Sequence, residues 1–323
     1  MRLDVLNATV SGWARYGRAL VPFLDGFVIG TTKPTALNTG AITAEGSLTD
    51  ASGIVYLAAG STYSGKHLTG RIVVQGPNVT ISDCIIDMPA SATDIHAITC
   101  WTAGATNVLI DRVTIRVPAP NQSYWIGAGI HGSGFTARRC NITGTTDGIM
   151  PAGINQRAAV TIEGCYIGNL TWFADDGYPA RVGSHSDGTH NDDVQAEGNL
   201  TSCTIRGNRL GTGRTSCIIV TENANTYDTA PAITDNWFEI DDATFGTMLN
   251  LAKASMTSMG SAQIKRNTFP LGTSPARMFI LPAYLTAIGT AGGISASGTD
   301  HNVYTDASFP VTVYNGTANT TSY

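Results

Sequence analysis

Charged side chains are scarce in this sequence: Asp, Glu, Lys and Arg make up 13% of 323 residues, and only four residues are lysine. The formal net charge is −5. A protein that binds nucleic-acid phosphates needs a basic surface, so we expect no nucleic-acid partner. Long apolar runs are missing too, since no 18 consecutive residues are apolar. We therefore expect no membrane span.

The first residues lack the basic segment and continuous apolar segment of a secretory signal peptide. The most apolar piece near the N-terminus, residues 19–30, is interrupted by Pro22 and Asp25. If the protein acts outside a cell, we expect it to arrive there within a virus particle or by non-classical release such as lysis.

Lys, Glu and Leu are infrequent, whereas Gly, Ser, Thr, Asn, Val and Ile are abundant, with 36 glycines alone. β-branched residues favour strands, and Gly and Asn favour tight turns. This composition predicts an all-β protein with many short strands.

A six-residue motif recurs from about residue 70: an apolar residue, two polar residues, a small residue, one polar residue and a second apolar residue. Successive copies begin about 29, 27, 25, 43, 28 and 31 residues apart. Such spacing is typical of a solenoid whose turns carry loops of different length. The seven copies begin at Ile81, Ile110, Ala137, Ile162, Ile205, Ile233 and Ile264.

The small residue of each motif should stack on its equivalents about 4.8 Å away in adjacent turns. We therefore interpret the cysteines at this position as free, buried core residues rather than as disulfide partners, and the asparagines as a hydrogen-bonded stack. The stacked residues are Cys84, Val113, Cys140, Cys165, Asn208, Asn236 and Asn267.

A second strand should follow in each turn, at residues 97–99, 129–131, 148–150, 193–195, 217–219 and 248–250. This register predicts a column of residues on the outer surface, just before these strands. The column contains His96, Ala128, Asp147, Asp192 and Ser216.

These strands, the Cys and Asn ladder and the Asp147-Gly148-Ile149 tripeptide resemble the right-handed parallel β-helix of the pectin-lyase-like superfamily, over about residues 45–285. Lys33-Pro34, residues 73–87 and residues 185–195 further resemble tail-associated β-helix proteins of actinobacteria and their phages. Those relatives commonly read His-Asn-Asp-Gly-Ile-Gln in the last stretch, so Asp193 and Val194 depart from the pattern.

The resemblance implies a single-stranded right-handed parallel β-helix at residues 51–285. Residues 1–50 would form an irregular attachment or capping segment, in which residues 5–20 are a short helix or an irregular arm and residues 26–30 a strand. Residues 286–323 would form a cap or an association segment, with strands at residues 303–304 and 311–314. Closing an open end in this way, or pairing it with other copies in a homotrimer, would protect unpaired strand edges.

Two imidazoles and three carboxylates gather in residues 185–193, within the longest interval between repeats. If Asp147 lies on the turn next to Asp192, the two carboxyl groups cannot both ionise freely, and one should have a raised pKa, as glycoside hydrolysis requires. The candidate catalytic residues are Asp147, Asp187, Asp192, Asp193, His185 and His190.

Three alternatives to hydrolysis remain open for the cluster. In a polysaccharide lyase, the Asp residues would hold Ca²⁺ while Arg181 or His190 takes the proton. A transition metal would instead use His185, His190 and Asp187. In the third alternative, the loop is stabilised only by its own hydrogen bonds.

Candidate substrate contacts lie in the same interval. Trp172 and Tyr178 could stack on sugar rings, and Arg181 could meet an acidic group. The leading hypothesis is a phage tail protein of the virion that binds a bacterial cell-envelope polysaccharide, with or without cleaving it, and that contacts other tail proteins. The alternatives are a free bacterial lyase or glycoside hydrolase and a purely structural minor tail protein.

Overall fold

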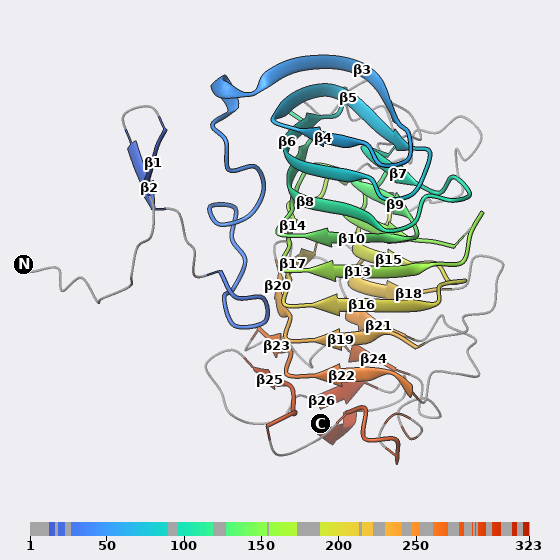
Figure 1. Ribbon diagram of the computed structural model, residues 1–323. Helices are drawn as coiled ribbons and strands as arrows, with labels where there is room; N and C mark the ends of the chain where they lie inside the picture. Colours follow the sequence, from blue (N-terminus) through green and yellow to red (C-terminus); the bar gives the residue numbers. More distant parts are fainter. Residues whose placement is uncertain are drawn as a thin grey trace, which may run out of the picture.

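The chain forms one parallel β-helix whose turns stack from β3 to β26 (Figure 1). The all-β fold predicted from composition and repeats is confirmed. This computed structural model describes residues 13–16, 19–22, 27–89, 96–118, 127–153, 155–172, 188–212, 215–221, 230–240, 247–251, 261–270, 278–280, 286, 288, 290–294, 299–304, 312–314 and 319–322. No helix among these residues is long and apolar enough to cross a membrane.

The strands of successive turns form three ladders, called here faces 1, 2 and 3. Face 1 contains β4 (Thr62–Ser64), the first parts of β6 (Thr80–Asp87) and β8 (Val108–Arg116), β10 (Phe135–Arg138), β13 (Ala159–Glu163), β16 (Ser202–Arg206), β19 (Ala232–Thr234) and β22 (Gln263–Lys265). Face 2 contains the first parts of β3 (Thr49–Leu57) and β5 (Lys66–Val74), the last parts of β6 and β8, β11 (Asn141–Ile142), β14 (Tyr166–Gly168), β17 (Arg209–Thr212), β20 (Trp237–Ile240), β23 (Thr268–Phe269) and β25 (Val303–Tyr304).

Face 3 contains the last parts of β3 and β5, followed by β7 (Ile98–Cys100), β9 (Ile130–Gly132), β12 (Ile149–Pro151), β15 (Asp192–Ala196), β18 (Ser216–Val220), β21 (Thr247–Asn250), β24 (Met278–Phe279) and β26 (Thr312–Tyr314). β27 (Asn319–Ser322) pairs antiparallel with β26. β1 (Trp13–Tyr16) and β2 (Ala19–Pro22) form a separate antiparallel pair, and η1 (Glu45–Ser47) is a 3-10 helix.

The strand register agrees with the repeat. On face 1, the first apolar residues of all seven motif copies pair in sequence, from Ile81 with Ile110 through to Ile233 with Ile264. On face 3, Ile98, Ile130, Ile149, Val194 and Ile218 pair in the same way. Both predicted strands of each turn are therefore in the expected alignment.

Each motif bends at its third position, between faces 1 and 2. The residue there has a positive φ, between 50° and 64°, in Asp83, Arg112, Arg139, Gly164, Gly207, Asp235 and Arg266. The next residue points into the core, which explains the buried Cys and Asn ladder. All six cysteines are free and buried, as the sequence predicted.

A second corner bends β3 and β5 between faces 2 and 3. Gly70 has a φ of +153°, and a Cβ atom there would lie 1.9 Å from the carbonyl oxygen of Gly53. Only glycine allows the two backbones to approach so closely.

Residues 27–44 run along the outside of the first corner (blue in Figure 1). The Asp83 carboxylate accepts the Ile42 and Thr43 amides at 2.7 and 2.9 Å, and the Gly40 amide donates to the Arg139 carbonyl at 2.7 Å. At the other end of the segment, Arg206 donates to the Ile29 carbonyl. The strand predicted at residues 26–30 is wrong, because residues 27–30 are irregular or turn and residue 26 lies outside the described part.

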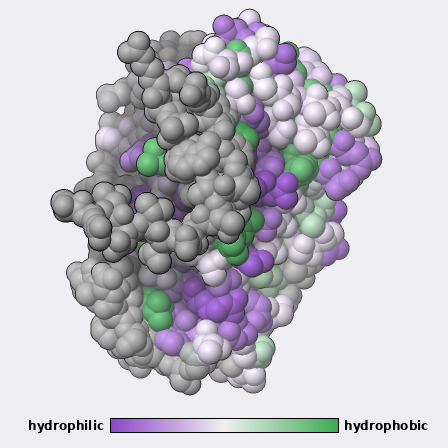
Figure 2. Space-filling view, turned by 60° about the vertical axis from the view of Figure 1, so that its left-hand side comes forward, coloured by the Kyte–Doolittle hydropathy of each residue, from purple (hydrophilic) through white to green (hydrophobic). Residues whose placement is uncertain are grey.

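The helix proposed as one alternative for residues 5–20 is wrong where the chain is described, because β1 and β2 lie there. The strand expected at residues 303–304 is present, and of the strand expected at residues 311–314 the structure shows residues 312–314, with residue 311 outside the described part. Figure 2 shows one side of the molecule, on which the described hydrophobic residues appear as separate spots among hydrophilic ones.

Candidate functional site

Asp147 and Asp192 lie on adjacent turns, at the start of face 3. Ile149 pairs with Val194, and the Asp192 amide donates to Oδ1 of Asp147 at 3.0 Å. The long interval between the repeats therefore leaves the register intact. The predicted alignment of the two carboxyl groups is confirmed.

The predicted exposure of this column is wrong. Asp147 is 3% exposed and Asp192 is 2% exposed, and His96, Ala128 and Ser216 are buried as well. The reason is a repeated hydrogen bond: Nδ1 of His96 accepts the Ala128 amide at 3.0 Å, just as Asp147 accepts the Asp192 amide. Each of these two side chains accepts a backbone amide of the next turn. That amide lies at or just before the start of the face 3 strand, where pairing with the strand of the previous turn has not yet begun.

The electrostatics of Asp147 follow from its surroundings. Burial, and secondly the charge of Asp192, raise the pKa of Asp147 well above its ordinary value. A protonated Asp147 is the form expected of a general acid. It is also the form that can be buried at low cost.

Asp193 is fully buried next to Val194, behind Gly148. A Cβ atom at Gly148 would lie 2.4 Å from both the Asp193 carbonyl oxygen and Cγ2 of Ile167. The glycine of the Asp147-Gly148-Ile149 tripeptide is thus required by packing between turns.

The other predicted residues fall into two groups. His190 and Trp172 are half-buried, and Asn191, next to His190, donates to the carbonyls of Thr146 and Thr171 at 2.7 and 2.8 Å. This amide joins both ends of the long interval to the turn before it. His185, Asp187, Tyr178 and Arg181 lie outside the described residues.

Ca²⁺ does not fit the described carboxyl pair. Calcium prefers several ionised oxygen ligands, whereas burial disfavours the charged form of Asp147 and its Oδ1 already accepts the Asp192 amide. We derive no metal-assisted step from this pair.

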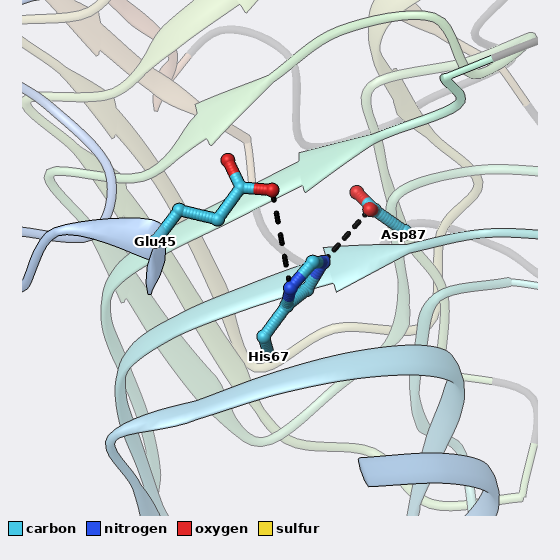
Figure 3. Close-up of side chains that lie close together, drawn as sticks. All are labelled: Glu45, His67 and Asp87. Carbon is cyan, nitrogen blue, oxygen red and sulfur yellow. Dashed lines mark hydrogen bonds and ion pairs between the residues drawn. The ribbon is translucent and has the colours of Figure 1, made fainter. Parts of the chain in front are cut away.

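A second polar group, which the sequence did not indicate, surrounds His67 at the N-terminal end of the solenoid (Figure 3). Nε2 of His67 lies 2.8 Å from Asp87, and Nδ1 lies 3.9 Å from Glu45 and 3.5 Å from Asp50. One ligand atom each from Glu45, His67 and Asp87 lies within 4.8 Å of the others, a geometry compatible with a metal ion.

Arg116 already supplies a cation to this group. It binds Asp87 at 2.5 Å and Glu45 at 2.7 Å. The hydrogen bond from Arg116 lowers the pKa of Glu45, and although burial alone would raise the pKa of Asp87, hydrogen bonds from Arg116 and His67 lower it. The group therefore ties η1 to the first turns. The sequence feature that could have revealed this group is the motif register, which pairs Asp87 directly with Arg116.

A third group consists of rings on face 3. His96 and His131 have ring centroids 4.1 Å apart, and Trp101 packs on His131 at 5.0 Å. Burial lowers the pKa of His96 to about 3 and that of His131 to about 4. Both imidazoles are neutral at pH 7.

Comparison with known proteins adds no assignment. No protein-family model, no curated protein and no solved structure matches the chain. Function is therefore inferred from the sequence, the fold and the sites.

Proposed function

We propose that this β-helix is a virion protein of a phage tail that binds a bacterial cell-surface polysaccharide. The supporting observation is the stacked register of face 3, in which equivalent side chains recur from β7 to β21. Successive residues of a column lie about 4.8 Å apart. Solenoids use such elongated surfaces to bind extended polymers, and a long cell-envelope glycan is a polymer of that kind.

The assignment to a phage tail, and the partners it implies, are supported by the sequence. The resemblance of residues 185–195 to tail-associated β-helix proteins supports a place in the virion, in contact with other tail proteins and with further copies of the chain as a homotrimer. A free extracellular protein of the pectin-lyase-like superfamily is the alternative.

Depolymerisation of the polysaccharide is the second candidate function. A carboxyl group with a raised pKa beside another carboxyl group is the arrangement that acid catalysis needs, and Asp147 and Asp192 fit it. Their burial opposes this candidate, because a glycosidic oxygen must come within hydrogen-bond distance of the acid. We therefore rank binding above cleavage.

The test is retention and depolymerisation of purified cell-envelope polysaccharides by the wild type and by Asp192→Asn, with Ca²⁺ or with a chelator. Retention without chain shortening is the expected result. Shortening that Asp192→Asn abolishes with the fold intact would establish an enzyme, and unsaturated products would make it a lyase. Neither retention nor shortening across an adequate panel would leave a structural tail protein.

A further inference from the structure

Exposed hydrophobic side chains gather on the outer surface of face 3 at its N-terminal end. Three of the five large hydrophobic residues that are exposed in the described part of the chain lie there, namely Ile54, Tyr56 and Trp101. Tyr56 is 57% exposed and Trp101 39% exposed. Aromatic residues that are exposed together on one face are enriched at binding surfaces.

The strand register places these residues on one surface. Tyr56 pairs with Val73, Val73 with Thr99, and Thr99 with His131. Three strand steps put Tyr56 about 14 Å from His131. Trp101 packs on His131 and therefore lies at the far end of this surface.

Arg71 supplies a cation on β5, the strand between β3, which carries Tyr56, and β7, which Trp101 follows. It pairs with Ile54 on β3, and the Ile72 amide next to it donates to the Ala97 carbonyl at 2.8 Å. Its guanidinium is close enough to His96 to affect that imidazole electrostatically. Arg71 is half-buried and forms no ion pair within 4.0 Å with any acidic group in the described part of the chain. Its guanidinium can therefore donate to an anion.

The histidine beneath Trp101 is a second, independent observation. His131 is buried, and neither ring nitrogen has a hydrogen-bond partner among the described residues. A buried polar group without a partner costs stability, and each such group in a native protein calls for an explanation.

We infer that Tyr56, Arg71 and Trp101 form a carbohydrate-binding surface that takes an anionic polysaccharide chain. The two aromatic rings stack on the apolar faces of sugar rings, and Arg71 binds an acidic substituent of a sugar between them with paired N–H donors. His131 supports the indole from below. This inference rests on the proposed function and names the residues and the sugar class for it, at a place separate from Asp147 and Asp192.

The experiment measures the binding of a uronic-acid hexasaccharide and of its carboxyl-reduced, neutral counterpart by calorimetry. The wild type should bind the acidic sugar more tightly. Trp101→Ala should weaken binding of both sugars about tenfold, and Arg71→Gln should weaken only the acidic one by a similar factor. Trp101→Phe keeps an aromatic face and should retain most of the affinity.

Matched controls lie away from the surface. Leu37→Ala removes a hydrophobic side chain that is 95% exposed, and Arg206→Gln removes another partly exposed arginine. Both should bind as the wild type does, and unfolding midpoints should show that every variant is folded.

Equal binding by the wild type, Trp101→Ala and Arg71→Gln would overturn the inference, as would no binding of either sugar. Self-association that Trp101→Ala abolishes would instead assign the surface to a second copy of the chain. The same variants tested on cell-envelope polysaccharides separate the two proposals. Retention unaffected by either substitution overturns this surface and leaves the proposed function standing, whereas a wild type that retains no polysaccharide overturns the proposed function.

Discussion

Asp147 and His96 occupy equivalent positions in different turns and have the same role: each accepts the amide of the equivalent residue one turn later. In the sequence, polar residues at this position indicate a surface column. Their burial could not be predicted, because it depends on where the ladder begins in the next turn rather than on the pattern of polar and apolar residues. The same residue types therefore serve as caps of buried amides.

Replacement of Asp147 by asparagine should make stability less dependent on pH. A carboxyl group whose folded-state pKa is raised stabilises the fold below its unfolded-state pKa of about 4, and this contribution is lost as the pH rises towards the folded-state value. The wild type should lose up to about 1.4 kcal/mol per pH unit in this range from this group. The substituted amide would keep the acceptor oxygen without the ionisation.

Urea denaturation between pH 4 and pH 8 measures this difference. Relative to the wild type, Asp147→Asn should gain stability as the pH rises, whereas the exposed Leu37→Ala, which changes no titratable group, should follow the wild-type curve. Parallel curves for the wild type and Asp147→Asn would show that the carboxyl group is not held in its protonated form. Near pH 4, Asp147→Ala should cost about 1–3 kcal/mol, because the Asp192 amide loses its acceptor, and this cost should shrink as the pH rises, because alanine does not ionise.

At the scale of the elements, the asparagine ladder shows how one motif position can stabilise several strands. Oδ1 of Asn236 accepts both the amide and the side-chain N–H of Asn208, and its Nδ2 donates to the Ile205 carbonyl and to Asn267. All of these groups are buried. Deleting the side chain leaves several of them without partners at once.

Asn236→Ala should therefore destabilise the fold by about 3–5 kcal/mol. Cys140→Ala is the matched control: it removes a buried side chain from the same ladder position, but the thiol makes only weak contacts, at 3.6 Å to the Ile110 carbonyl and 3.4 Å to the Arg138 carbonyl. It should cost about 1 kcal/mol. Equal losses in chemical denaturation would mean that the asparagines act by packing alone.

Much of the solenoid could be predicted from the sequence because apolar pairs such as Ile162 and Ile205 recur in every turn, and a shift of register would expose them. The same apolar pairing keeps the strands in register across the 43-residue interval between Ile162 and Ile205. The docking of residues 27–44 could not be predicted, since they contain no repeat. Their main acceptor, Asp83, belongs to a motif position that the sequence describes only as polar.

Asp83→Gly should release residues 42–43 from the corner. Glycine accepts the positive φ of 50° at this position, so the substitution removes the carboxylate without backbone strain. The Ile42 and Thr43 amides should then exchange with deuterium at least about tenfold faster. Asp83→Asn keeps an acceptor oxygen and should exchange more slowly than the glycine variant; unchanged exchange in Asp83→Gly would show that the segment is held elsewhere.

The whole molecule has six thiols that report on its cooperativity. All six are free and buried, and burial raises the pKa of Cys100 to about 12, so the reactive thiolate is rare in the native state. A thiol reagent at pH 8 should modify none of them in the folded protein and all six in denaturant. A reductant should leave the unfolding midpoint unchanged, because no disulfide contributes to stability.

The order in which the thiols become reactive tests how the turns are coupled. A solenoid whose turns contact only their neighbours would fray from its ends and expose Cys84 or Cys217 at lower denaturant than Cys140. Residues 27–44 oppose this fraying, since they bind the corner at Asp83, Arg139 and Arg206 and so connect turns that do not touch. We expect all six thiols to become reactive over one transition, and in Asp83→Gly we expect Cys84 and Cys100 to react first.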